Sequence, residues 1–176
     1  MHNEDELTFG VVPISTPTRD RAKKFTFTDD QTKAYNGLIK FINEPYNPND
    51  FKRALIGPGG TGKTFLLKAL LQDCNIPFSE IGLSAPSHKA CRVLRNSIKG
   101  THCNVNTIQS DFGFKPNYDI EKFDINNVTF ASYGRIKIED YRLYIVDESS
   151  MLNRSLVTYI DKMMKKYSIK LILCGK

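Results

Sequence analysis

Four glycines fall within eight residues of this chain, in the stretch Gly57-Pro58-Gly59-Gly60-Thr61-Gly62-Lys63-Thr64. The stretch fits the pattern G-x-x-x-x-G-K-[ST], follows a short apolar segment and opens an apolar helical pattern. Glycines allow a tight turn in which successive backbone N–H groups point at phosphate oxygens, and the N-terminus of the following helix adds partial positive charge. This phosphate loop, as residues 57–64 are called below, predicts a strand, loop and helix unit that binds a nucleotide.

Two side chains of the phosphate loop are expected to contact the ligand. Lys63 is predicted to reach the β- and γ-phosphates and to act in catalysis, and the Thr64 hydroxyl is predicted to bind Mg²⁺. The other predicted contacts to the nucleotide are Gly57, Gly59, Gly60, Thr61 and Gly62. The competing interpretation is a glycine-rich turn that matches the pattern by chance, expected in roughly one chain of this length in a couple of hundred.

A pair of acids, Asp147 and Glu148, ends the apolar stretch 143–146. If this stretch is a strand of a parallel sheet, its carboxyl end places the acids beside the phosphate loop. Asp147 is then expected to hold the metal ion, and Glu148 to orient or deprotonate an attacking water molecule. The competing interpretation is a pair of solvated acids at the end of a strand.

The order of apolar and polar stretches predicts an α/β domain. Helices are expected over about 29–43, from Lys63 to before Asn75, from the capping residue Ser87 to before Gly100, and over 155–167. Strands are expected at 53–56, 79–85, 143–146 and 169–174. Residues 101–114 are expected to hold a short helical turn, and 115–141 are left undecided. Alternation of this kind predicts a parallel sheet with helices on both faces.

The composition fits a folded domain with a basic surface. Of 176 residues, 40% are hydrophobic, which excludes a disordered tail protein. Lys and Arg number 25 against 19 Asp and Glu, so the formal net charge is +6 and favours a polyanionic partner. Residues 1–24 show no helical or strand period and are predicted to form a flexible arm, which leaves residues 25–176 as one domain.

Metal, disulfide and membrane signals are weak. The four cysteines form no C-x-x-C unit and are expected to be reduced thiols, and His102 beside Cys103 supplies only half of a zinc site. No apolar run reaches the roughly 18 residues of a membrane helix, and the first ten residues lack the layout of a secretion signal. We therefore expect a cytoplasmic protein that has no membrane partner.

Several segments resemble, in order and approximate spacing, the first motor domain of superfamily 1B DNA helicases of the RecD-like and phage Dda-type group. They are the phosphate loop, residues 83–90 (LSAPSHKA), 107–110 (TIQS) and 147–151 (DESSM). The resemblance spans about residues 25–176. It implies a RecA-like domain that binds ATP and Mg²⁺ and couples ATP hydrolysis to movement on single-stranded DNA and to duplex unwinding in DNA replication. It also implies a bacterial or phage-infected host cell.

The same resemblance places Gln31 against the adenine ring, whose edge an amide can serve as donor and acceptor. Gln31 also occupies the capping-box position opposite Thr28, and one side chain cannot serve both roles fully. The residues that the resemblance implies for DNA contact are Pro86, Ser87, His88, Lys89, Arg92, Thr107 and Gln109. Lys89, Arg92, Arg95 and Lys99 recur at helical spacing, and a solvated helix face explains that stripe equally well.

Residues 115–140 lie where related helicases insert a small β-hairpin that separates the strands. Residues 128–133 and 135–138, on either side of Gly134, are predicted to form its arms, and a plain surface hairpin is an equal alternative. The chain departs from the family at Gln109, where relatives carry histidine, and at Lys176, where they continue with Gly-Asp.

The second motor domain of these helicases has no counterpart in the sequence. The resemblance therefore implies a truncated helicase, or one that takes its second motor domain from another chain, with slow ATP hydrolysis when alone. Two other hypotheses stay open. One is a stand-alone P-loop ATPase or kinase with a small substrate, and the other is a non-catalytic regulatory fragment that binds DNA or a helicase.

Overall fold

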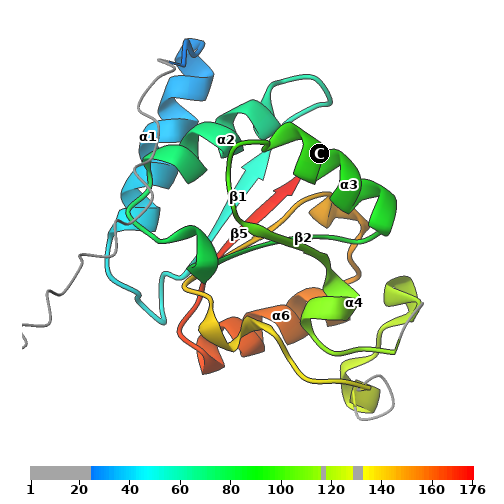
Figure 1. Ribbon diagram of the computed structural model, residues 1–176. Coiled ribbons are helices and arrows are strands. Elements are labelled where there is room, and N and C mark those ends of the chain that lie inside the picture. The colour runs from blue at the N-terminus through cyan, green and yellow to red at the C-terminus, as the bar shows by residue number, and fades with distance from the viewer. Residues whose placement is uncertain (1–24, 116–117, 129–132) are drawn as a thin grey trace, which may run out of the picture.

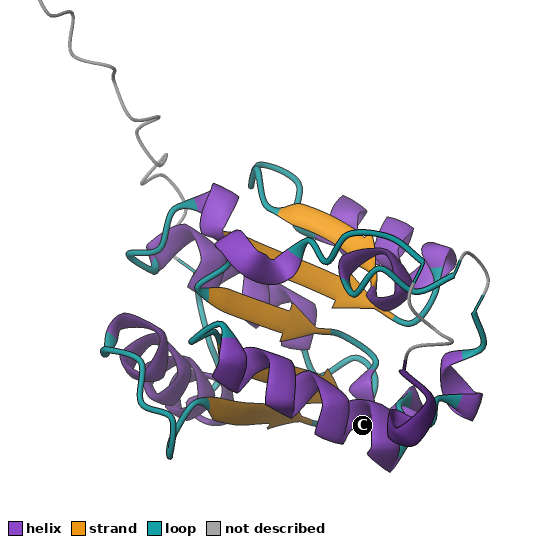
Figure 2. Ribbon diagram, turned by 90° about the horizontal axis from the view of Figure 1, so that it is seen from below, coloured by secondary structure: helices purple, strands orange, loops and turns teal. Residues whose placement is uncertain are grey.

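The computed structural model describes residues 25–115, 118–128 and 133–176, which build an α/β domain on a five-stranded parallel sheet. The strand order is β1-β5-β4-β2-β3, and the strand arrows point the same way in Figure 2. The strands are Lys52–Ile56 (β1), Ile81–Ala85 (β2), Asn104–Thr107 (β3), Leu143–Val146 (β4) and Lys170–Gly175 (β5). The helices are Asp29–Asn43 (α1), Lys63–Asp73 (α2), His88–Ser97 (α3), Ile108–Asp111 (α4) and Arg154–Lys166 (α6). The predicted fold class is confirmed.

Helices cover both faces of the sheet, as Figure 1 shows. α1, α2 and α3 pack on one face, and α6 packs with parts of residues 108–141 on the other. β4 shows why both faces are apolar. Leu143 and Ile145 point into the first core, whereas Tyr144 and Val146 point into the second, because successive side chains of a strand face opposite sides. All four side chains are therefore buried.

α1 begins at a complete capping box. The Thr28 hydroxyl accepts a hydrogen bond from Gln31 N at 3.3 Å, and Gln31 Oε1 accepts one from Thr28 N at 3.1 Å. At its other end, the buried Lys170 donates hydrogen bonds to the carbonyl oxygens of Phe41 and Ile42, which a helix C-terminus leaves without partners. Burial lowers the pKa of Lys170. The predicted bounds of α1 are confirmed.

One strand was missed, because residues 101–114 were expected to hold only a helical turn. They form β3 followed by the four-residue α4. β3 lies at the edge of the sheet and buries only Val105 and Thr107, so its sequence lacks a continuous apolar run. The strand expected from Ser79 begins at Ile81, because Phe78–Glu80 form a 3₁₀ turn (η1). The other predicted elements are present with ends that differ by no more than two residues.

The prediction of a hairpin within residues 115–140 is wrong for the second arm, because residues 135–138 do not form a strand. Arg135 to Lys137 are irregular and Ile138–Asp140 form a 3₁₀ turn (η4), as do Ile120–Lys122 (η2) and Ile125–Asn127 (η3). The backbone N–H groups of Tyr133 and Gly134 donate to Gly113 O instead of to a neighbouring arm. Residues 129–132 of the first arm, residues 116–117 and the predicted arm 1–24 lie outside the described residues.

The described residues contain neither a metal-binding cluster of side chains nor a helix that could cross a membrane. Within residues 25–115, 118–128 and 133–176, no cluster of three or more His, Cys, Asp or Glu side chains is arranged to hold a metal ion. Over the same ranges, every helix is too short or too polar to span a bilayer.

Candidate functional site

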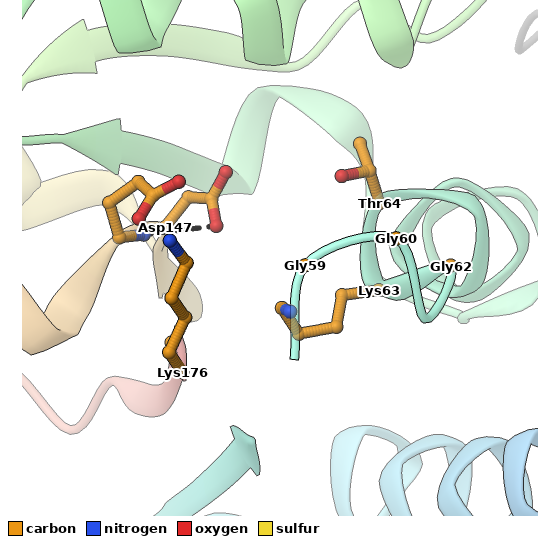
Figure 3. A pocket seen from close by; sticks show the side chains of 9 residues that line it. Gly59, Gly60, Gly62, Lys63, Thr64, Asp147 and Lys176 are labelled. Carbon is orange, nitrogen blue, oxygen red and sulfur yellow. Dashed lines mark hydrogen bonds between the residues drawn. The ribbon is translucent and has the colours of Figure 1, made fainter. Parts of the chain in front are cut away.

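The loops that follow β1, β4 and β5 enclose a pocket of about 330 Å³ at the carboxyl edge of the sheet. These three strands are neighbours, so segments far apart in sequence meet at this edge. Figure 3 shows the phosphate loop on one side of the pocket and Asp147 on the other, with the Thr64 hydroxyl directed toward the acid side. The lining residues are Gly59, Gly60, Gly62, Lys63, Thr64, Asp147, Glu148, Gly175 and Lys176.

Gly62 precedes α2 in a left-handed conformation, with φ +82°. A Cβ atom there would lie 2.6 Å from Gln31 Nε2, so α1 packs directly against the phosphate loop. Gln31 Nε2 donates a hydrogen bond to Thr61 O at 2.9 Å. Its Oε1 atom accepts the capping bond from Thr28 N, so both ends of the amide have protein partners. The amide keeps a second N–H and a second oxygen lone pair, so an adenine contact by Gln31 shares the amide with these two partners.

Substituting Gly62 by alanine is expected to lower the free energy of unfolding by about 2 kcal/mol, because a Cβ atom is disfavoured at this φ. It must also displace the Gln31 amide. Gly59→Ala is the matched control, because a Cβ at Gly59 would meet no atom within 4 Å, and a change of under about 0.5 kcal/mol is expected. Urea unfolding of both variants without nucleotide measures the difference. Equal unfolding free energies would contradict the assigned role of Gly62.

The Lys63 ammonium group lies against the phosphate loop itself. Nζ donates to Gly57 O at 2.5 Å and to Pro58 O at 2.9 Å. Thr61 Oγ1 also donates to Pro58 O, at 2.9 Å, which ties the two halves of the loop together. A phosphate oxygen is a stronger, charged acceptor than a carbonyl oxygen, so the ammonium group is placed to exchange these partners for a polyphosphate.

Asp147 and Glu148 follow directly on β4. The backbone N–H of Asp147 donates to Ser84 O at 2.8 Å, which extends the pairing with β2 to the acid itself. Asp147 Oδ1 accepts a hydrogen bond from Glu148 N at 3.0 Å. Burial raises the pKa of Asp147 and the neighbouring Glu148 charge adds to this, whereas the bond from Glu148 N and the positive charge of Lys63 oppose it. A cation in the pocket would favour the ionised form of this carboxyl.

Glu148 adopts a left-handed backbone conformation, with φ +53° and ψ +35°. It caps a 3₁₀ turn, Ser149–Met151 (η5), whose residues do not line the pocket. This conformation costs a residue with a side chain on the order of 1 kcal/mol, and such strain is commonly found at functional sites. The backbone geometry thus places two adjacent carboxyl groups at the lining of one pocket, opposite the phosphate loop.

Most of the predicted nucleotide residues come together in this pocket. Gly57 and Thr61 do not line the pocket. Gly57 N donates a hydrogen bond to Gly175 O at 3.2 Å, and Thr61 O accepts one from Gln31 Nε2. Gly175 and Lys176 line the pocket and were not predicted as site residues. The sequence signal that could have identified these two residues is that the last apolar strand ends there. Its position beside β1 depends on the strand order, which the sequence does not state.

A second pocket of about 570 Å³ lies at the carboxyl ends of β2 and β3, and we call it the aromatic groove. Five residues predicted to contact DNA line it, namely Pro86, Ser87, His88, Thr107 and Gln109. Residues that were not predicted for this role complete its walls, among them the rings of Phe114, Tyr118 and Tyr133 and the cations Arg135 and Lys137. Lys89 and Arg92 do not line the groove and are exposed on α3.

Some polar groups of the predicted DNA surface have structural roles. Ser87 Oγ caps α3 by accepting from Ala90 N at 3.2 Å, as expected, and Thr107 Oγ1 caps α4 in the same way. Arg95 Nη2 donates to Val105 O at 2.8 Å, which ties α3 to β3. The basic stripe on α3 therefore has one member that is engaged within the domain. Gln109 Nε2 donates to Tyr118 O at 3.2 Å across the groove.

Comparison with known protein families gives one match. Residues 40–176 match the model of the family described as AAA domain. No curated protein matches the chain. AAA-type P-loop domains typically bind a nucleotide and Mg²⁺, and they occur in helicase-like proteins. Because the match covers more than half of the chain and the fold carries a phosphate loop where such domains have it, the chain belongs to the AAA domain family of P-loop proteins.

Proposed function

We propose that this chain is the ATP-binding motor domain of a DNA helicase, which couples ATP hydrolysis to movement along single-stranded DNA and to duplex unwinding. The observation that carries the proposal is the placement of two pockets along one edge of one sheet. The nucleotide pocket lies at β1, β5 and β4, and the aromatic groove lies at β2 and β3. Asp147 N donates to Ser84 O at the junction of β4 and β2, so the acid is joined by a backbone hydrogen bond to the strand that precedes the groove.

ATP is the proposed ligand of the first pocket. The backbone of the phosphate loop and Lys63 would hold the β- and γ-phosphates. The Thr64 hydroxyl and the Asp147 carboxylate are oxygen donors of the kind Mg²⁺ prefers, and bound Mg²⁺ would neutralise charge on the phosphates. Glu148 is the proposed acceptor of a proton from the attacking water. These four side chains all line the same pocket.

Single-stranded DNA is the proposed ligand of the aromatic groove. The Tyr133 ring, which is 72% exposed, offers a stacking surface for an unpaired base, and Arg135 and Lys137 offer positive charge to phosphates. Ser87 and His88 lie at the N-terminus of α3, where side chains and backbone N–H groups can donate to a phosphate. A second motor domain, in the same polypeptide or in another chain, is the proposed partner that closes the nucleotide pocket.

Binding of a fluorescently labelled oligo-dT, followed by anisotropy between 50 and 300 mM salt as an assay range, tests the groove. Arg135→Ala is expected to weaken binding about fivefold and to reduce the salt slope by about one, because one phosphate contact is lost. Lys162→Ala is the control, since it removes the same charge from an exposed position on α6. Arg92→Ala tests the exposed face of α3 separately.

Equal affinities and salt slopes in Arg135→Ala and Lys162→Ala would contradict DNA binding in the aromatic groove. An oligo-U of equal length determines whether the strand is DNA or RNA, because a groove that recognises the sugar distinguishes the two. Wild-type protein that releases phosphate from ATP, but neither binds oligo-dT nor responds to it, would replace the helicase proposal with a stand-alone ATPase or kinase. ATP binding without phosphate release, even with oligo-dT and a second motor domain supplied, would favour the regulatory fragment.

A further inference from the structure

Asp111 is the one acidic side chain that is fully buried within residues 25–115, 118–128 and 133–176. It lies in α4, directly after the groove residues Gln109 and Ser110, and neither pocket uses its carboxyl group. A buried carboxylate is costly unless other groups satisfy it by hydrogen bonds. The hydrogen-bond partners of the Asp111 carboxylate explain how this group is accommodated in an apolar core.

The carboxylate joins three elements. Asn106 Nδ2, on β3, donates to Oδ1 at 2.9 Å, and the hydroxyl of Tyr144, on β4, donates to Oδ2 at 2.9 Å. Tyr144 is itself fully buried, so its hydroxyl has no access to solvent. The two bonds hold α4 on the sheet at the point where β3 ends, which is the floor of the aromatic groove.

The backbone beyond the carboxylate holds the far wall of the groove. Lys137 N donates to Asp111 O at 2.9 Å, and Lys137 Nζ donates to Ser110 Oγ at 2.8 Å. Gly113 O accepts from Tyr133 N at 2.6 Å and from Gly134 N at 2.9 Å. A Cβ atom on Gly113 would overlap the carbonyl oxygen of Gly134, and its φ is +67°. Residues 133–137 are therefore held on the segment 111–113 by these backbone hydrogen bonds, and they form no strand pairing among themselves.

We propose that Asp111 is a positioning residue of the aromatic groove, whose carboxylate fixes α4 and thereby the wall at Tyr133, Arg135 and Lys137 in a strand-binding arrangement. The inference rests on the proposed binding of single-stranded DNA in this groove. It assigns Asp111 no contact with the ligand, because the side chain has no exposed surface. The acceptor geometry of the side chain, more than its charge, carries the effect, since both partners are hydrogen-bond donors.

The assays of this proposal are to be run at pH 8, because the protonation state of Asp111 depends on pH. Burial raises the pKa of Asp111 to about 6, against the hydrogen bonds from Tyr144 and Asn106 and the positive charge of Lys137. At pH 8 the carboxyl group is therefore ionised and accepts both bonds. Tyr141, Tyr144 and Cys91 also interact electrostatically with Asp111; burial raises the pKa of each, and they remain neutral there.

Asp111→Ala is the disruptive variant, because it removes the acceptor of the buried Tyr144 hydroxyl and of the half-buried Asn106 amide. We expect hydrogen exchange in the DNA-free protein to become at least tenfold faster at the amides of Tyr133, Gly134 and Lys137. Exchange in β4 and β5 should change less than twofold. Oligo-dT should bind at least tenfold more weakly, while the affinity for a fluorescent ATP analogue stays within twofold of wild type.

Asp111→Asn is the conservative rescue. Its amide oxygen can accept from Tyr144, and its amide nitrogen can donate to Asn106 once that side chain reverses its own amide. Exchange rates and oligo-dT affinity within threefold of wild type are expected. If Asp111→Ala does not fold, Tyr144→Phe replaces it, because it removes one of the two donors and leaves the ring in place; the same pattern with a smaller change is expected.

The outcomes separate this inference from the proposed function. Wild-type protein that does not bind oligo-dT removes the strand-binding proposal, while the exchange rates still test whether Asp111 positions the wall. Wild-type binding that persists unchanged in Asp111→Ala, with unchanged exchange at residues 133–137, overturns the positioning role alone. Faster exchange throughout the sheet, with parallel loss of nucleotide affinity, shows a general structural role and also overturns it.

Discussion

Lys63→Ala is expected to weaken ATP binding by about 100-fold. The ammonium group is the charged donor of the phosphate loop, and it now lies on the carbonyl oxygens of Gly57 and Pro58. In the complex it would move to the β- and γ-phosphates, and charged hydrogen bonds of this kind are worth about 3 kcal/mol together, which corresponds to roughly a hundredfold in affinity. Alanine removes these contacts and leaves the backbone of the loop intact.

Titration with a fluorescent ATP analogue in Mg²⁺ buffer measures this loss. Lys68→Ala is the matched control, because it removes the same charge from the same helix at a position that does not line the pocket, and affinity close to wild type is expected. Thermal unfolding of both variants without nucleotide checks that the loop still folds. Wild-type affinity in Lys63→Ala would show that the ammonium group does not contact the phosphates.

Glu148→Gln is expected to retain ATP within about threefold and to lose hydrolysis by a factor of about 10² to 10⁴. Glutamine has the shape of glutamate, but its amide cannot take a proton from water. Glu148 lines the nucleotide pocket, and because the two side chains are nearly isosteric the substitution leaves the pocket the same size. Binding and catalysis should therefore separate in this variant.

Single-turnover phosphate release, with and without oligo-dT, measures the effect even when turnover of this domain is slow. Asp147→Asn provides the contrast. It removes a proposed Mg²⁺ ligand, so the increment in ATP affinity that Mg²⁺ gives to the wild type should disappear. In Glu148→Gln that increment should persist. Phosphate release at the wild-type rate in Glu148→Gln would show that this residue takes no part in the reaction. Loss of the Mg²⁺ increment in both variants would show that Asp147 and Glu148 both act in binding Mg²⁺, which contradicts their separate roles.

The nucleotide half of the site could be predicted because its signals are local. The phosphate loop is a continuous segment between a strand and a helix, and its pattern includes five of the nine residues that line the pocket. The acids follow directly on a fully apolar strand, so the edge to which they belong was implied by the parallel sheet. The start of α1 was predicted because its capping box is encoded by two residues three positions apart.

The second groove could be predicted only in part. Ser87 was predicted as a capping residue that follows a strand, and Thr107 was predicted through the resemblance of residues 107–110 to a helicase segment; both lie at the groove. Its far wall, residues 133–137, has no period, because its backbone bonds go to Asp111 and Gly113 and form no hairpin. Arg95 looked like part of a surface stripe until Val105 O was found as its partner. Partners that are distant in sequence leave no pattern in a single chain.

The sequence by itself determined the class of fold, the loop that faces a nucleotide and the acid pair opposite it, because each depends on residues that are neighbours along the chain. The tertiary structure alone decided three things: that Gln31 braces the phosphate loop, that Gly175 and Lys176 complete the pocket, and that Asp111 lies beneath the groove. Strand order and helix packing bring these groups to their partners, and both are set by burial of apolar surface over the whole domain.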